Sequence, residues 1–351
     1  MHPYRDLPDR SFWNRCAAAS DFARDQLYQP AFPIEKGMKI ATAGSCFAQH
    51  VGRYLRTSNA DLIDVEPAPD GLSEETARRF GYRLFSARYG NIYTVRQFRQ
   101  LLEDCAGATV HAEAIWQRGG RCWDALRPGV EPDGLDSAEE VAAHRREHLA
   151  RVNAMLRQVE VFVFTLGLTE TWTDRATGRA YPIAPGVIAG RHDPAAHAFV
   201  NADYPSVLAD LKKARDLLQA RNKSMRMILT VSPVALAATA TGGHVLAATV
   251  YSKSVLRAAA GAMAAEFADV DYVPSFEVIA GTPSAGRFYA GDLREVTPDG
   301  VAAAMEMFFS AHPGLGPAPA GPEAELVPTP VSDDEEDDVV CEERLLGAFR
   351  E

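Results

Sequence analysis

Short runs of consecutive apolar residues alternate along this chain with segments in which apolar residues recur every three or four positions. The runs are typical of buried strands, and they predict strands at residues 38–44, 159–166, 225–231 and 270–274. The second pattern predicts helices directly after the first strand and at residues 95–102, 137–158, 204–222, 249–267 and 301–309. Strands that alternate with helices indicate an α/β fold with a mostly parallel sheet that is covered on both faces.

Other segments lack both patterns and are expected to be irregular, or irregular or helical in the case of the first 37 residues. Residues 1–37 form a lead-in whose aromatic residues should anchor it to the body: Phe12, Trp13, Phe22, Tyr28 and Phe32. Loops are predicted around Trp116 and Trp123 and over residues 180–205, which contain several Pro and Gly.

Composition is that of a protein with one large domain, since the chain has 351 residues of which 47% are hydrophobic. No apolar stretch approaches the roughly 20 residues of a membrane helix. Residues 1–6 lack the basic start and apolar run of a signal peptide. The five cysteines are scattered and form no CxxC pair, so neither a disulfide framework nor a zinc site is expected. A cytoplasmic location fits this pattern.

The formal charge of −11 argues against nucleic-acid binding. Nine acidic and two basic residues lie from Val331 onward, so most of the net charge sits in this tail. Residues 314–330 are rich in Pro, Gly and Ala and are interpreted as a linker, which leaves residues 1–313 as the body. The stretch 341–349 fits either a short amphipathic turn that docks on a partner or on the body, or a part of a solvated tail.

Polar motifs follow three of the predicted strands. They are Ser45-Cys46, Thr169-Glu170 and Ser232-Pro233. Because ligands bind beyond the carboxyl ends of parallel strands, these side chains are expected to line one site.

The first of these motifs has the form of a reactive elbow between a strand and a helix. At such a turn, backbone N–H groups and the helix dipole favour negative charge, which activates a thiol and can hold an oxyanion. Cys46 and Ser45 are therefore candidate nucleophiles. A buried small thiol beside a helix-capping serine explains the same residues without any reaction. His50 lies one helical turn after Cys46 and could polarise it, or could be a surface residue.

Further candidates follow the third strand. His244 lies beyond a Gly-Gly turn, where it could enter the site or bond to backbone. Lys253 and Arg257 share a helix face that could bind an anion or merely face solvent, and Glu277 could orient Lys253. Two loop histidines at 192 and 197 could line a lid. No metal-ligand spacing and no nucleotide-binding loop is present.

These residues resemble the GSCFA-domain family, named after the letters at 44–48. The resemblance runs through TAGSCFAQHVGRYL, FSARYGNIYT, VFVFTLGLTETW, ILTVSPVALAAT, YSKSVLRAAA and YVPSFEVIAG. It covers about residues 12–310. The family is placed among the SGNH (GDSL-like) hydrolases, so the resemblance implies their three-layer αβα sandwich.

The resemblance also implies site roles. Aligned with the GDSL turn of SGNH enzymes, Gly44 to Phe47 places Cys46 at the nucleophile and Ser45 at the aspartate. Gly167 to Glu170 resembles the GxND segment, with Thr169 in place of the oxyanion-binding asparagine. The Gly90-Asn91 turn could supply another donor.

The family's C-terminal D-x-x-H segment, which supplies the base, is altered here. The chain has Asp292 in the first position and Glu295 where the histidine is expected. Glu295 or His244 would then handle protons, or hydrolysis is not the activity.

The resemblance implies an acyl hydrolase or acyltransferase for ester or thioester bonds, with a small-molecule or glycan substrate. No cofactor is implied beyond an acyl-thioester donor. The alternative is a binding or scaffold protein that has lost the reaction and contacts a protein partner through residues 331–351.

Overall fold

The computed structural model describes residues 2–17, 27–319, 342–343 and 345–346. Phe22, Cys341 and the acidic run 333–338, which entered the expectations above, lie outside the described residues. Below, the C-terminal segment means residues 342, 343, 345 and 346.

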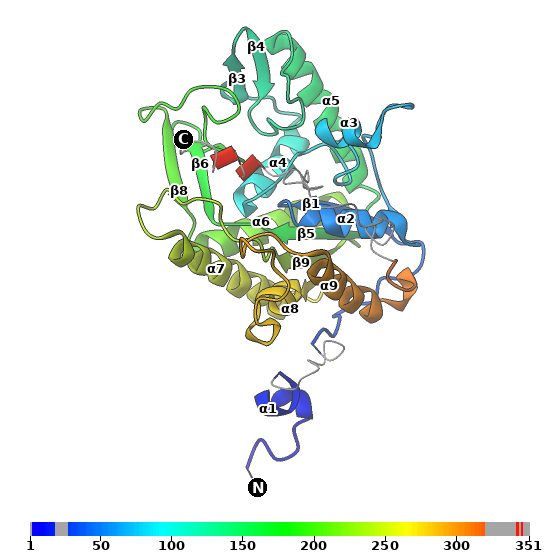
Figure 1. Ribbon diagram of the computed structural model, residues 1–351. Coiled ribbons are helices and arrows are strands. Elements are labelled where there is room, and N and C mark those ends of the chain that lie inside the picture. Colours follow the sequence, from blue (N-terminus) through cyan, green and yellow to red (C-terminus); the bar gives the residue numbers. More distant parts are fainter. Residues whose placement is uncertain (1, 18–26, 320–341, 344, 347–351) are drawn as a thin grey trace, which may run out of the picture.

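A five-stranded sheet forms the centre of the molecule (Figure 1). Its order is β10 (Val270–Val273), β9 (Arg226–Val231), β5 (Val161–Leu166), β1 (Lys39–Gly44) and β2 (Asp61–Leu62). Every neighbouring pair is parallel. The four predicted strands are thus present, and the two-residue β2 adds an edge that is too short to leave a pattern in the sequence.

Helices cover both faces of this sheet, which gives three layers. Residues of four helices pack in one core: α4 (Val95–Gly107), α5 (Ala138–Leu156), α6 (Tyr204–Arg221) and α7 (Val245–Glu266). A second core contains residues of α2 (Ala48–Thr57), α8 (Ser275–Ala280) and α9 (Pro298–Ala311). The α/β fold with a parallel central sheet is confirmed.

Alternation along β5 explains why both faces need cover. Phe162 and Phe164 point into the first core, while Val161 and Val163 point into the second. Phe98 of α4 stacks on Phe164 with ring centroids 4.2 Å apart. An unbroken apolar strand of this kind is stable only between two helical layers.

Side-chain caps fix where the helices of the first core begin. The Thr94 side chain accepts a hydrogen bond from the backbone nitrogen of Gln97, and the Gln97 side chain accepts one from the backbone nitrogen of Thr94, which completes a capping box. Ser137 caps α5 by accepting from the backbone of Glu140. The Glu140 carboxylate binds the nitrogen of Asp136 rather than that of Ser137.

The loops predicted around the two tryptophans and at 180–205 are partly wrong, because both regions contain short strands. Trp116 and Trp123 pair across the hairpin of β3 (Ile115–Arg118) and β4 (Arg121–Asp124). Its turn is Gly119-Gly120, with both φ angles positive, which is a typical hairpin turn. A second antiparallel sheet contains β6 (Glu170–Asp174), flanked by β7 (Ala180–Tyr181) and β8 (His197–Asn201). Such short, half-buried strands carry too little alternation to be recognised.

Short helical segments complete the chain. They are η1 (Asp9–Ser11), α1 (Trp13–Cys16), α3 (Glu74–Arg79), η3 (Ala112–Ala114), η4 (Thr282–Ser284) and η5 (Pro313–Leu315).

The lead-in, residues 1–37, is anchored by only part of its aromatic set. Tyr28 and Phe32 are buried, and the Tyr28 hydroxyl donates to Asp271 at 2.8 Å. Trp13 is 64% exposed, and α1 lies apart from the body (Figure 1), so the expected anchoring role of Trp13 is wrong.

The body continues past residue 313. Leu315 is buried in the second core, so the first residues of the expected linker belong to the packed domain. No helix among the described residues has the length and apolar character needed to cross a membrane.

Candidate active site at the carboxyl edge of the sheet

The order of the strands predicts where a ligand should bind. From β1 the sheet extends in opposite directions, to β2 on one side and to β5, β9 and β10 on the other. In open α/β sheets, ligands bind beyond the carboxyl ends of the two strands at such a switch point, which here are β1 and β5. The elbow follows β1, and Gly167 to Glu170 follow β5, so two of the predicted motifs meet there.

Gly44 makes the sharp turn out of β1. Its φ is +143°, a region that residues with a side chain rarely adopt, and a Cβ atom would lie 2.5 Å from the carbonyl oxygen of Thr165. The chain turns against β5 there, and Ser45 donates its backbone N–H to that same oxygen at 3.1 Å. Only glycine permits this approach.

The start of the β5 loop packs equally tightly. A Cβ atom on Gly167 would lie 2.8 Å from the Cβ of Ser45 and 2.9 Å from the carbonyl oxygen of Tyr93. The nitrogens of Gly167 and Leu168 both donate to that carbonyl, at 3.1 and 3.0 Å. The Gly167 amide, a predicted oxyanion donor, is therefore already used. Ser45 is buried, and its hydroxyl has no hydrogen-bond partner in the described part of the chain.

Cys46 is 5% exposed and sits in a tight turn at the start of α2. The nitrogens of Ala48, Gln49 and His50 bond to the carbonyls three residues earlier. These three amides of the helix are thus used within the turn and do not serve as donors to a ligand.

Lys253 of α7 brings a cation to this site. It is 3% exposed, and its Nζ donates to the carbonyl oxygen of Gly167 at 2.6 Å. Burial is the main reason why the pKa of Lys253 is lowered to about 8. Arg294 also lowers this pKa, whereas Glu343 and Cys46 raise it. The thiol and the amine therefore lie within electrostatic range of each other.

Arg257 does not share this environment, although it lies one helical turn from Lys253. It forms an ion pair with Glu277, and its guanidinium lies 4.0 Å from the centre of the Tyr272 ring. Glu277 also accepts from the Tyr272 hydroxyl. The expectation that Glu277 orients Lys253 is thus wrong, since its carboxylate is held by two other residues.

Asn91 and Tyr93 supply neutral donors to the site. Gln49 donates its side-chain N–H to Asn91 Oδ1 at 3.0 Å, which turns Asn91 Nδ2 outward. Nδ2 donates to Glu342 Oε2 at 2.5 Å, and the Tyr93 hydroxyl donates to the same oxygen at 2.7 Å. The predicted role of Asn91 as a donor is consistent with this geometry.

Glu343, the neighbour of Glu342, meets a guanidinium. Arg294 Nη2 lies 3.4 Å from Glu343 Oε2, and Arg294 Nε donates to the carbonyl of Ala235 at 3.1 Å. Both glutamates are buried, at 5% and 8% exposure. The C-terminal segment therefore packs on the body.

Thr169, Glu170 and Ser232 hold loops in place. The Thr169 nitrogen donates to Ser252 Oγ at 3.0 Å, and its hydroxyl donates to Asn201 Oδ1 at 2.6 Å. The Glu170 carboxylate accepts from Thr239 and from the nitrogen of Ala240, which fastens the loop after β9. A hydroxyl that is already donating is a poor oxyanion donor.

Ser232 is buried where β9 ends. Its nitrogen donates to the Leu166 carbonyl at 2.8 Å, and its hydroxyl accepts from the nitrogen of Val234 at 3.3 Å. These contacts give Ser232 a role in shaping the loop.

The candidate bases make hydrogen bonds with nearby backbone groups. His244 is exposed and caps α7, accepting from the nitrogen of Leu246 at 3.1 Å. Asp292 is exposed and accepts from the nitrogens of Arg294 and Glu295 in a local turn. The Glu295 carbonyl accepts from the nitrogen of Ala290. None of these contacts brings His244, Asp292 or Glu295 to Cys46, and their catalytic roles stay predictions.

The other three candidate histidines, at positions 50, 192 and 197, form aromatic contacts. His50 packs edge-on against Phe47 with ring centroids 5.6 Å apart. The ring centroids of His192 and His197 lie 5.8 Å apart, and the His192 ring packs edge-on against Trp172 of β6. Within the described ranges, no three His, Cys, Asp or Glu side chains are grouped to hold a metal ion.

Sequence reasoning missed Tyr93, Arg294 and the C-terminal glutamates. Tyr93 had a usable signal, because it lies two residues after Asn91 in an extended segment, where alternate side chains share a face. Arg294 lies inside the altered D-x-x-H segment but is not one of its marked positions. Charged residues are rarely buried, so an acidic tail gave no reason to expect Glu342 or Glu343 in the site.

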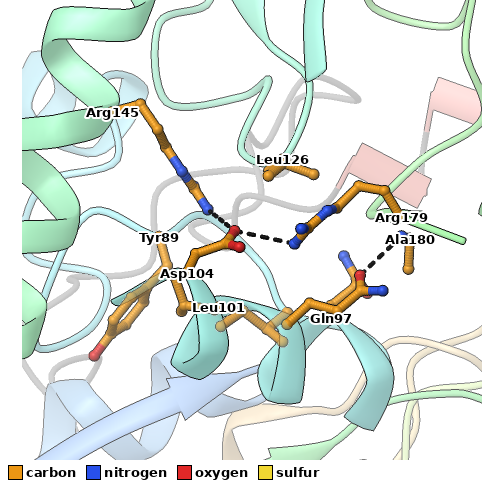
Figure 2. Close-up of a pocket in the computed structure, with 10 residues that line it drawn as sticks. Tyr89, Gln97, Leu101, Asp104, Leu126, Arg145, Arg179 and Ala180 are labelled. Carbon is orange, nitrogen blue, oxygen red and sulfur yellow. Dashed lines mark hydrogen bonds and ion pairs between the residues drawn. The ribbon is translucent and has the colours of Figure 1, made fainter. Parts of the chain in front are cut away.

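A second polar cluster lies away from the elbow, around a hollow beside α4 (Figure 2). Asp104 is buried there and binds Arg145 at 3.3 Å, Arg179 at 3.0 Å and His111 at 2.9 Å. Two guanidinium groups compensate one carboxylate, so the cluster ties α4, α5 and the strand-bearing loops together.

Comparison with known proteins gives one result. The model of the GSCFA family matches residues 39–308, which is well over half of the chain and includes the elbow, Asn91, Lys253 and Arg294. No curated protein and no solved structure matches significantly. The chain therefore belongs to the GSCFA family.

Proposed function

We propose that this protein is an SGNH-type acyl hydrolase or acyltransferase in which Cys46 is the nucleophile and Lys253 the proton acceptor. The observation that carries the proposal is the buried amine of Lys253, held at the Gly167 carbonyl within electrostatic range of the elbow thiol. A lysine whose pKa is lowered to about 8 is partly neutral near physiological pH and can accept a proton.

The reaction has two halves. The neutral Lys253 amine takes the thiol proton, and the Cys46 sulfur attacks the carbonyl carbon of an ester or thioester. The tetrahedral intermediate collapses, its bond to the leaving oxygen or sulfur breaks, and Lys253 returns the proton to the leaving group. Water or an acceptor hydroxyl then gives a proton to Lys253 and attacks the acyl-enzyme, and the Cys46 thiol is released and reprotonated.

Asn91 and Tyr93 supply the oxyanion stabilisation in this proposal. Their donors converge on one oxygen, that of Glu342, at 2.5 and 2.7 Å. Preorganised neutral donors of this kind stabilise the charge that develops on a carbonyl oxygen. They take over the part that the sequence comparison gave to Thr169, whose hydroxyl is donated to Asn201.

The acyl donor is a small ester or thioester and the acceptor is water or a glycan hydroxyl, on analogy with the family. We place the protein in the cytoplasm on the pattern of its cysteines. Ser45 remains the second choice of nucleophile. It ranks behind Cys46 because its side chain is buried beside Gly167.

The test is acyl-enzyme formation, followed by intact mass after treatment with a short-chain acyl thioester. We expect one acyl group per chain in the wild type and in Ser45→Ala, and none in Cys46→Ala. Lys253→Met should slow acylation by about 10²–10⁴-fold, the usual contribution of a positioned proton acceptor.

The matched control is Arg257→Met, one turn along the same helix, which should acylate at the wild-type rate. Acylation of other cysteines at the same rate as Cys46, or equal rates in Lys253→Met and Arg257→Met, would refute the proposal. The scaffold alternative would then stand, with the C-terminal segment bound in a site that performs no chemistry.

A further inference from the structure

The C-terminal segment brings two adjacent carboxylates to the candidate active site. Glu342 and Glu343 lie about 50 residues beyond Arg294 in sequence, yet both are buried against the body. Burial of a carboxylate is costly unless donors or a cation compensate it. The groups that surround these two side chains therefore reveal what the site is built to bind.

The position of Glu342 is defined by donors. Asn91 and Tyr93 both donate to its Oε2, and Gln49 fixes the amide of Asn91 so that nitrogen rather than oxygen faces it. On the other side the carboxylate packs against the backbone of Gly129, where a Cβ atom would lie 2.8 Å from Glu342 Oε1. This subsite fits an oxygen-bearing planar group closely.

The position of Glu343 is defined by positive charge. Arg294 lies 3.4 Å from its Oε2, and Lys253 interacts with Glu343 electrostatically. Arg294 is itself held in place by the Ala235 carbonyl. A fixed guanidinium with a buried ammonium nearby is suited to bind a carboxylate rather than a neutral group.

The rest of the segment packs against the two small sheets. Leu346 contacts the apolar cluster that contains Trp116, Trp123 and Tyr181. In Figure 1 the segment, drawn in red, lies between β6 and α4. The segment therefore lies against Asn91, Tyr93 and Arg294 on one side and against the apolar cluster of the small sheets on the other.

We propose that these two subsites recognise an anionic substrate that carries a carboxylate in addition to its reacting carbonyl, and that Glu342 and Glu343 fill them by mimicry. The Asn91–Tyr93 subsite takes the reacting carbonyl, and the Arg294–Lys253 subsite takes the acidic substituent. This inference rests on the proposed function for the meaning of the first subsite. Binding itself requires no reaction and can be measured without one.

The probe is glutarate, a five-carbon dicarboxylate, titrated by calorimetry into the full chain carrying Cys46→Ala so that no chemistry contributes. Glu342→Gln with Glu343→Gln removes the competing charges at nearly constant shape. Because the apparent dissociation constant scales inversely with the fraction of open sites, glutarate should bind at least about tenfold more tightly to this double variant. Glu35→Gln with Glu75→Gln removes the same number of charges at two exposed glutamates distant in sequence from the segment, and this control should show no gain.

Two further arms test the chemistry of recognition. Arg294→Gln in the double variant should abolish the gain, and Arg294→Lys, which keeps the charge and loses the planar fork, should retain part of it. Dimethyl glutarate, which is neutral, should not bind. Equal glutarate affinity in all variants, or equal affinity for the dimethyl ester, would overturn the inference. Absence of acyl-enzyme in the wild type with intact glutarate binding would refute only the proposed reaction.

Discussion

Ser252 accepts a hydrogen bond from the backbone nitrogen of Thr169 at 3.0 Å, which ties α7 to the carboxyl end of β5. The next residue of α7 is Lys253, so this bond helps to hold its amine at the Gly167 carbonyl. Ser252→Ala leaves a buried N–H unpaired, and we expect a loss of about 1–3 kcal/mol in the free energy of unfolding. It should also slow acylation of Cys46. Ser254→Ala, on the exposed side of the same helix, is the control, and an equal acylation rate in both variants would contradict this role.

The proposed proton acceptor predicts a pH dependence. Burial lowers the pKa of Lys253 to about 8, so the neutral amine is scarce below that pH and predominates above it. The rate of Cys46 acylation should therefore rise with pH and level off above about 8, measured with a pH-insensitive thioester. In Lys253→Met this inflection should disappear, whereas Arg257→Met should keep it. Persistence of the inflection in Lys253→Met would assign it to another group.

The elbow glycine predicts a contrast between two substitutions. Gly44→Ala forces a side chain into a positive φ and to within 2.5 Å of the Thr165 carbonyl oxygen. Gly37 also has a positive φ, but nothing lies within 4 Å of a Cβ atom there. We expect Gly37→Ala to cost about 1 kcal/mol in chemical denaturation. Gly44→Ala should cost at least about twice that, and equal costs would show that the elbow has room to relax.

Gln49 is predicted to act through Asn91. Gln49→Met keeps the length of the side chain but removes the donor that fixes the Asn91 amide. Loss of one oxyanion donor typically costs about 10²–10³-fold in rate, so acylation should fall toward that range with little change in substrate binding. Gln158→Met, at an exposed position, is the control. A change confined to the Michaelis constant would place Asn91 in binding rather than in stabilisation of the intermediate.

Acid stability should depend on His148, which is buried with its Nδ1 2.7 Å from Glu66 Oε2. Burial, with Arg127 nearby, lowers the pKa of His148 from 6.5 to about 4 despite the attraction of Glu66. The unfolded chain thus takes up a proton near pH 6.5 that the folded chain accepts only near pH 4. Stability should fall by about 3 kcal/mol across this window as the pH drops.

His148→Asn keeps an N–H that can reach Glu66 but does not titrate. Its free energy of unfolding should change less between pH 6.5 and 4 than that of the wild type, measured by urea denaturation at several pH values. His144→Asn, one turn earlier on α5, serves as control and should keep the wild-type slope. Parallel slopes in His148→Asn and the wild type would exclude His148 as the source.

The sequence predicted four of the five strands of the central sheet because each of the four is a run of mostly apolar residues, whereas β2 has only two residues. Thr94 and Ser137 could be assigned as helix caps because their partners lie three residues away. The strands β7 and β8 could not be predicted, since β7 has only two residues and β8 is half-buried without alternation, and their pairing with β6 depends on contacts across the chain.

The candidate site, too, could be predicted where its residues are neighbours in sequence and not where they come from separate elements. The elbow was predictable because Gly44, Ser45 and Cys46 are consecutive and end a strand. The convergence of Gln49, Asn91 and Lys253 was not, because three separate elements bring them together. His244 attracted attention as a histidine in a glycine-rich loop, yet its side chain caps α7, a common use of a polar residue before a helix.

The position of Glu342 and Glu343 has a consequence for any molecule that binds the end of this chain. Two carboxylates cannot occupy the site and an external receptor at once, so the two equilibria are linked. A ligand that fills the Arg294 subsite must displace the C-terminal segment. A receptor that binds the segment therefore raises the affinity for the ligand, and the ligand raises the affinity for the receptor by the same factor. Since the C-terminal segment is tethered to the body, a ligand displaces it when the ligand's concentration relative to its dissociation constant exceeds the segment's effective concentration relative to its own.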